Sequence, residues 1–256
     1  MELDSTDSQA PALQRGLAVL EFLSGRNEAA TLSEISAALK LSPASIFRLT
    51  GVLESAGYLH REETSRRFSL TRKLFLQAQP KHEGRSLVEC CLPSMREILQ
   101  LTGETVQLCC LADNQCVMLE QLPSTYPFKY IVDLGSRISV HCCAPGKAIA
   151  AYLTEEGRSA LIHSLILERY TDQTIVSKRD LLEELEKIKN RGYAADQGEH
   201  FDGIHCIAAP LLDRHGNAVA AITIAGPSSR IQVRRFAEFG AIIKQATTVA
   251  AQRYLG

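Results

Sequence analysis

The side chains best able to carry out chemistry are cysteines and histidines in the second half of the chain. The six that fall into two short stretches are His141, Cys142, Cys143, His200, His205 and Cys206. Thiolate and imidazole groups bind zinc, and a thiol beside an imidazole can act as a nucleophile or a redox sensor. The chain's eight cysteines include three adjacent pairs but no CxxC spacing, which indicates buried free thiols. We therefore expect that these residues bind no metal or cofactor and carry out no catalysis. The alternative is that the thiols and imidazoles sense a metal ion or an oxidant.

A second chemical feature is a local excess of positive charge. The whole chain is almost neutral, with 28 basic and 29 acidic residues, so any interface with nucleic acid must be local. Residues 40–73 contain seven basic and three acidic side chains. The basic ones are Lys40, Arg48, Arg61, Arg66, Arg67, Arg72 and Lys73. Such a stretch can meet the phosphates of DNA.

Residues 31–57 predict two short helices joined by a tight turn. Thr31 is followed three residues later by Glu34, which is a capping box. Ser42 and Pro43 provide an N-cap and a proline at the first helical position. This pattern is typical of a helix-turn-helix, whose second helix enters the major groove of DNA. We expect contacts to DNA from the small, polar or outward-facing residues Ser42, Ala44, Ser45, Phe47 and Arg48.

A β-hairpin is predicted directly after the second helix. Residues 58–61 and 66–70 form two short runs on either side of a polar turn. This hairpin would be the wing of a winged helix, and we expect Arg61, Arg66 and Arg67 to meet the DNA there. A winged helix used for protein contacts is the alternative.

The rest of the chain alternates between strand-like and helix-like segments. Strands are expected at 105–112, 116–122, 130–134, 193–196, 204–212 and 218–224, with helices between and after them. The expected fold class is α+β, with an N-terminal winged helix-turn-helix and a mixed sheet with helices on one face. The expected divisions are a disordered N-terminus at 1–10, a DNA-binding domain at 11–70, a linker helix or hinge at 71–86 and an effector-binding domain at 87–256.

The chain has no apolar run of the roughly 20 residues that a membrane span needs. Its first ten residues are polar and acidic, unlike a secretory signal. We therefore expect a cytoplasmic protein with no membrane partner.

From about residue 13 to the end, the chain resembles the IclR family of bacterial transcription regulators. The matching stretches are Thr31–Ile35, Arg48-Leu49, Leu53, Gly57–Leu59, Gly103–Val106, His141-Cys142, Gly146–Ala148, Arg191–Tyr193, Asp196, Glu199-His200, Gly203, Cys206–Ala208 and Gly226-Pro227. The resemblance implies a GAF-like effector-binding domain, a homodimer or homotetramer, and a palindromic double-stranded DNA operator. It also implies a small carboxylic acid effector (hydroxy, keto or aromatic) and, as the commoner habit of the family, a repressor.

The resemblance also implies where the effector binds. The expected residues are Cys143, Ala144, Pro145, Lys147, Asp196, Cys206, Thr223 and Ala225. Two of them depart from the family, because Pro145 has no N–H and Ala225 has no hydroxyl, so both remove donors to an anion. Asp196 beside an anionic ligand would be repulsive unless it accepts from a ligand hydroxyl or is protonated, which makes a hydroxy acid or a hydrated aldehyde acid plausible.

Overall fold

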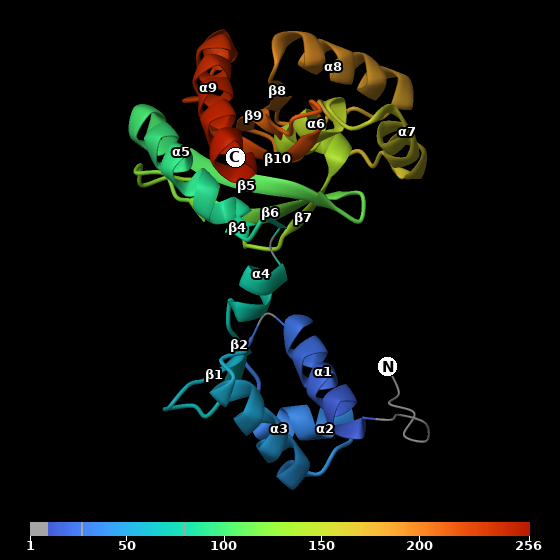
Figure 1. Ribbon diagram of the computed structural model, residues 1–256, viewed down its shortest axis with the longest axis vertical. Helices are drawn as coiled ribbons and strands as arrows, with labels where there is room; N and C mark the ends of the chain where they lie inside the picture. The colour runs from blue at the N-terminus through green and yellow to red at the C-terminus, as the bar shows by residue number, and fades with distance from the viewer. Residues whose placement is uncertain (1–9, 27, 79) are drawn as a thin grey trace. The chain divides into compact units, whose positions relative to one another are not determined.

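The protein is described here by a computed structural model, which covers residues 10–26, 28–78 and 80–256. The chain divides into two compact units, Met1–Ala78 and Gln79–Gly256 (Figure 1). The boundary falls inside the expected linker at 71–86, and the expected disordered segment at 1–10 lies, except for Ala10, outside the described residues.

The first unit is a small helical domain closed by a hairpin. Its elements are α1 (Pro11–Ser24), α2 (Leu32–Leu39), α3 (Pro43–Ser55), β1 (Leu59–Arg61), β2 (Phe68–Leu70) and α4 (Lys73–Ala78). The capping box at the start of α2 is confirmed, since the Thr31 N–H donates to Glu34 at 2.7 Å and the Thr31 hydroxyl accepts from the Glu34 N–H. Ile35 and Ile46 from the two helices are fully buried against Phe68 of the hairpin.

The second unit is built on one antiparallel sheet. Its strands are β5 (Thr105–Ala112), β6 (Gln115–Leu122), β7 (Arg137–Ser139), β8 (Ala194–Gln197), β9 (Ile204–Leu212) and β10 (Ala218–Pro227), in the order β7-β6-β5-β10-β9-β8. The α+β class is confirmed, but every pairing in the described part of this sheet is antiparallel, so the strand directions are not mixed. The expected strand at 130–134 is wrong, because this segment is irregular and β7 follows it.

Helices cover both faces of this sheet, not one as expected. They are α5 (Leu87–Thr102), α6 (Ala144–Ala151), α7 (Glu155–Ser164), α8 (Lys178–Arg191) and α9 (Phe236–Leu255), with short 3-10 turns at Val140–Cys142 and Val233–Arg235 and a small hairpin of β3 (Lys81–His82) and β4 (Arg85–Ser86). Figure 1 shows α5 and α9 on one side, and α6, α7 and α8 on the other. Both faces need covering because Ile222 and Ile224 of β10 point to one face while Ala221 and Ala225 point to the other.

We call the face of the sheet that α6 covers the cavity face, because an enclosed cavity lies on it. Register places Asp196 opposite Cys206, and Cys206 opposite Ala225. Two residues along β10, Thr223 lies between Ala208 and Gln107. Since paired residues share a face and alternate residues return to it, the cavity face carries Gln107, Cys109, Asp196, Cys206, Ala208, Thr223 and Ala225.

The close approach of α9 to Tyr193, two residues after the end of α8, gives a test of the fold. A Cβ added at Gly240 in α9 would lie 2.6 Å from two ring carbons of Tyr193. We predict that Gly240→Ala lowers the free energy of unfolding by about 1–3 kcal/mol, because the ring must move. Thermal or urea unfolding of the full chain measures this.

The control is Gly16→Ala in α1, where a Cβ meets nothing within 4 Å. Alanine is about 1 kcal/mol more favourable than glycine inside a helix, so this change should not destabilise the protein. Equal stability of Gly240→Ala and the wild type would contradict the packing of α9.

Candidate functional site

The first candidate site is the exposed face of α3. The Ser42 hydroxyl caps the helix by accepting from the Ser45 N–H, and Ile46 and Thr50 turn inward and are buried. This leaves Phe47 59% exposed and Arg48 exposed beside it. The structure therefore brings the predicted residues Ser42, Ala44, Ser45, Phe47 and Arg48 together at the N-terminal half of α3, with Ser45 half-buried.

The hairpin after α3 presents its arginines in three different ways. Arg66 has a φ of +56° in the turn and is exposed, and no hydrogen bond or ion pair of its side chain is found among the described residues. Arg67 turns inward, and its Nη1 donates to the Ala29 carbonyl at 2.7 Å and to Glu34 at 3.3 Å. The Arg61 guanidinium lies over the Phe68 ring, 5.4 Å from its centroid. Arg66 is thus the arginine of the wing best placed to reach a phosphate.

Glu34 connects the wing to the helix-turn-helix. The backbone N–H and hydroxyl of Thr31, together with the charge of Arg67, hold the pKa of Glu34 below its ordinary value. The same carboxylate therefore caps α2 and anchors the wing. This role of Arg67 could not be predicted from the local sequence, because Ala29 lies 38 residues away from it.

The second candidate site is an enclosed cavity on the cavity face of the second unit. Its free volume is about 30 Å³, room for about two water-sized groups. The walls are mainly sulphur-bearing, aromatic and aliphatic, with only a few polar groups. The lining residues are Gln107, Cys109, Cys116, Met118, Tyr130, Val132, Ser136, Ile138, Cys143, Pro145, Asp196, His200, Phe201, Ile204 and Cys206.

An almost completely buried ion pair supports one wall of this cavity. The ammonium group of Lys147 in α6 donates to both carboxylate oxygens of Glu199 at 2.5 Å and to the Ala195 carbonyl at 2.8 Å. These three bonds use all three N–H groups of the lysine. Burial opposes the charge on Lys147, but Glu199 and then Asp196 raise its pKa above the ordinary value. Lys147 is therefore a structural cation that has no donor left for a ligand.

Asp196 lies beside this pair without a cation of its own. Its Oδ1 accepts from the Glu199 N–H at 2.7 Å. Burial and then the negative charge of Glu199 raise the pKa of Asp196 to about 7, although Lys147 acts in the opposite direction. Because this pKa exceeds the value of 3.8 in an unfolded chain, ionising Asp196 opposes folding. Its contribution to stability therefore falls as the pH rises through this interval and is constant above it.

The predicted effector residues separate into two groups. Cys143, Pro145, Asp196 and Cys206 line the cavity, whereas Ala144, Lys147, Thr223 and Ala225 are buried behind its walls. The hydroxyl of Thr223 is buried and has no hydrogen-bond partner in the described part of the chain. The first turn of α6 offers an anion little, because Pro145 has no N–H and the Gly146 N–H interacts with the Cys143 sulphur.

Several lining residues were missed by the sequence analysis. Gln107 is a polar residue inside an apolar strand, which is the signal that the sequence offers, and the structure places it opposite Thr223. His200 is not among the expected effector residues, yet it lines the cavity and packs between Tyr170 and Phe201, with ring centroids at 4.6 and 4.2 Å. Its Nδ1 is buried and unpartnered within the described residues, and burial lowers its pKa.

The thiols around the cavity are held in the protonated form. Hydrogen bonding to Cys116 and burial raise the pKa of Cys143 well above its ordinary value, and burial does the same for Cys206. Thiolates are the reactive and metal-binding form of cysteine. Among the described residues, no group of three or more His, Cys, Asp or Glu side chains is arranged to hold a metal ion.

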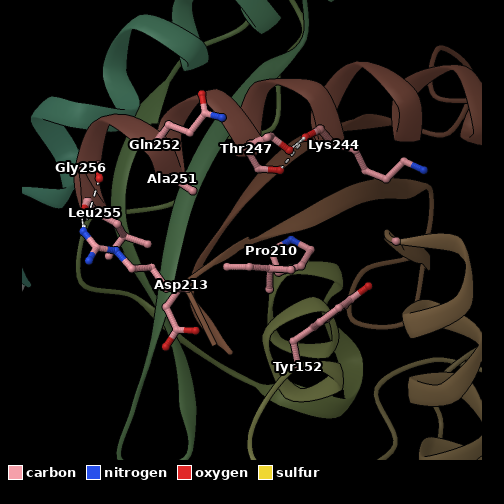
Figure 2. Close-up of a pocket in the computed structure, with 13 residues that line it drawn as sticks. Tyr152, Pro210, Asp213, Lys244, Thr247, Ala251, Gln252, Leu255 and Gly256 are labelled. Atoms are coloured by element: carbon pink, nitrogen blue, oxygen red, sulfur yellow. Dashed lines mark hydrogen bonds between the residues drawn. The ribbon is translucent and has the colours of Figure 1, made fainter. Parts of the chain in front are cut away.

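A larger groove lies on the same unit but is open to solvent. It has a volume of about 480 Å³ and runs between α9 and the turn that joins β9 to β10. Figure 2 shows residues of α9 such as Lys244 and Thr247 along one side, with Pro210 and Tyr152 across from them. Its two cations, Lys244 and Arg214, donate to backbone carbonyls, and none of the predicted effector residues lines it.

A winged helix-turn-helix in one unit and an enclosed cavity in the other define the class of DNA-binding regulators with a separate sensor domain. Two family profiles match: the IclR helix-turn-helix domain over residues 12–63, and the bacterial transcriptional regulator IclR C-terminal over residues 82–251. The chain belongs to the IclR family of bacterial transcription regulators. It is a regulator and not an enzyme.

Individual relatives agree with this assignment. The chain is 33% identical over 235 residues to the HTH-type transcriptional repressor AllR of Escherichia coli (strain K12), covering 92% of this chain and 87% of the relative. The fold matches the crystal structure of the Thermotoga maritima IclR, with a TM-score of 0.77, 24% identity and coverage of 95% of this chain and 98% of that one. It also matches an IclR homolog from Microbacterium hydrocarbonoxydans complexed with 4-hydroxybenzoate, with a TM-score of 0.76, 23% identity and coverage of 95% and 98%.

Two exposed arginines of the first unit, Arg48 and Arg66, should affect DNA binding differently. We predict that Arg48→Ala weakens discrimination between a specific site and random DNA by about 1–3 kcal/mol. Arg66→Ala should weaken both to the same extent and reduce the slope of log K against log salt by about 1. Fluorescence anisotropy at several salt concentrations measures both effects.

The matched control is Arg158→Ala in α7 of the second unit, which should leave both DNA affinities unchanged. An unchanged salt slope in Arg66→Ala would remove the hairpin from the interface.

The buried ion pair gives a second test. We predict that Lys147→Ala destabilises the second unit by about 3–5 kcal/mol, because the buried Glu199 carboxyl loses its cation and the two hydrogen bonds that this cation donates to it. The double variant Lys147→Met, Glu199→Gln should recover most of this loss, since it buries no unpaired charge. Urea unfolding of the full chain reports the difference.

An exposed ion pair provides the comparison. Arg179 pairs with Asp180 at 3.3 Å on the surface of α8, and Arg179→Ala should change stability by less than about 1 kcal/mol. If Lys147→Ala were as mild as Arg179→Ala, the buried pair would not support the cavity wall.

Proposed function

We propose that the chain is a transcriptional repressor whose affinity for its operator changes when a small molecule enters the cavity of the second unit. The observation that carries this proposal is an enclosed cavity, mainly apolar but lined by a few polar groups, in a unit separate from the winged helix-turn-helix. The AllR relatives are named transcriptional repressors, which supports repression and not activation for this chain. We further propose that the protein acts in the cytoplasm, where its operator DNA lies. Within the described residues, no helix is long and apolar enough to cross a membrane.

The DNA target that fits best is a palindromic double-stranded operator read by a homodimer or homotetramer. One α3 can contact only a few base pairs, so a specific site needs two recognition helices at a fixed half-site spacing. The linker at 71–86 is the proposed route by which the second unit alters that spacing. We propose DNA contacts from Ser42, Ala44, Ser45, Phe47, Arg48 and Arg66, with Arg61 and Arg67 mainly positioning the wing.

The proposed ligand is a small hydroxy or keto carboxylic acid. The small free volume favours an effector of a few heavy atoms, because the walls must move apart for any acid and would have to move much further for an aromatic one. The neighbouring structure complexed with 4-hydroxybenzoate supports an acid with a hydroxyl group as the general type. Cys143, Pro145, Asp196 and Cys206 are the proposed contacts, with Ala144, Lys147, Thr223 and Ala225 shaping the wall behind them.

The raised pKa values of the Cys143 and Cys206 thiols argue against the alternative of a thiol-sensing regulator.

Footprinting on the DNA upstream of the chain's own gene tests the regulator itself. We expect a protected, two-fold symmetric site at low salt, and addition of the effector should reduce protection. Absence of any protected site, with and without hydroxy, keto and aromatic acids, would contradict the proposal.

Replacement of one side chain tests the cavity. We predict that Asp196→Ala raises the half-maximal effector concentration for release of DNA by at least about tenfold, while operator affinity without effector is retained. Gel shifts across an effector titration measure both. The matched control is Asp202→Ala, an exposed carboxylate after the same strand, which should respond like the wild type; an equal response from Asp196→Ala would exclude Asp196 from the site.

A further inference from the structure

The cavity presents a carboxyl group to its contents but no cationic side chain. Among the described residues that line it, Asp196 is the only carboxyl, and neither lysine nor arginine is present. Lys147 is nearby, but all three of its N–H groups are used by Glu199 and the Ala195 carbonyl. A carboxylate entering this space therefore meets a potential negative charge and no counter-charge.

The charges that face Asp196 come from every element around it. Glu199 and His200 follow it on the same segment, and Lys147 comes from α6. The other titratable neighbours are Cys142 and Cys143 before α6, Cys206 on β9 and Tyr130 between β6 and β7. Burial or hydrogen bonding raises the pKa of each of these thiols and of the Tyr130 phenol, so all are neutral.

The group around Asp196 thus contains one lysine cation and two carboxyls. The lysine binds both oxygens of Glu199, so the excess proton belongs on Asp196. The Asp196 carboxyl lines the cavity and accepts hydrogen bonds from the backbone N–H groups of Glu199 and Gly198, the first of them at Oδ1. A neutral carboxyl can accept these bonds and still has one O–H donor to offer.

We propose that Asp196 recognises its ligand as a neutral carboxyl group, whose O–H donates a hydrogen bond to the carboxylate of the acid, so that one proton is held between two carboxyl groups. This rests on the proposed function, and it specifies how the same cavity holds an anion without a cation. When Asp196 is ionised in the free protein, binding of each carboxylate takes up one proton from solvent. An uncharged amide of the same acid has no such requirement.

The consequence is that affinity for the acid depends on pH. Below about pH 7 the proton is already present, and affinity is nearly constant. Above it, each further pH unit weakens binding about tenfold, giving a loss of roughly 100-fold by about pH 9. The ligand's own carboxyl is ionised throughout this range.

Isothermal titration of the full-length protein tests this with glycolate, glyoxylate, lactate, pyruvate and 4-hydroxybenzoate as probes. The tightest binder is titrated between about pH 6 and about pH 9, in buffers that differ in ionisation enthalpy. We expect uptake to rise from near zero to about one proton per ligand over this range. Binding of an acid with constant affinity and no proton uptake would overturn the shared proton and leave the proposed function standing. Binding of none of the probes at any pH would overturn both.

Asp196→Asn is the decisive variant, because its amide keeps a hydrogen-bond donor without a titrating proton. It should bind the same acid with an affinity that no longer falls with pH. Thermal unfolding without ligand establishes that this variant is folded, and the proton uptake of the wild type stands independently of it. If folded Asp196→Asn retained the full pH dependence, the proton would reside elsewhere and the proposal would be wrong.

Discussion

The buried contact between the Lys147 ammonium group and the Glu199 carboxylate is the constraint on which the second unit depends. Lys147 and Glu199 are 52 residues apart in the chain, so this contact fixes α6 against the segment after β8. The same segment is held from its other side, where the hydroxyls of Thr171 and Thr174 donate to the carbonyls of Gly198 and Glu199. With both attachments in place, the segment that carries Asp196 and His200 has little freedom, so the room for a ligand must come from the other walls of the cavity.

Asp196, the carboxyl that Lys147 does not bind, gives this wall of the cavity a hydrogen-bonding group without a counter-charge. A buried ion pair adds little to net stability, because desolvation offsets most of the attraction. Its value here lies in neutralising Lys147, which leaves Asp196 as a carboxyl without a counter-charge in a cavity of thiols and aromatic rings. In the first unit Glu34 has a similar role to that of Glu199, since it caps α2 and also binds Arg67 of the wing. In both units one carboxylate joins segments that the sequence keeps apart.

The sequence predicted those features that depend on near neighbours. The capping box at Thr31, the start of α3 at Ser42 and the outward face with Arg48 all follow from spacings of a few residues, and the structure has each of them. The features it did not predict depend on distant contacts. The inward turn of Arg67, the use of Lys147 by Glu199 and the helices on both faces of the sheet require partners dozens of residues away. The false strand at 130–134 has the same origin, because its apolar residues pack over the cavity and not into a ladder.

The central claim is that Asp196 in the empty cavity keeps its proton up to about pH 7, and this protonation can be observed directly. With aspartate labelled by ¹³C at the side-chain carboxyl, the resonance of Asp196 is the one that disappears in Asp196→Asn. The account predicts that this resonance titrates with a midpoint near the pKa of about 7, while exposed aspartates titrate near their ordinary value. A resonance that is already that of a carboxylate at about pH 5 would contradict the account.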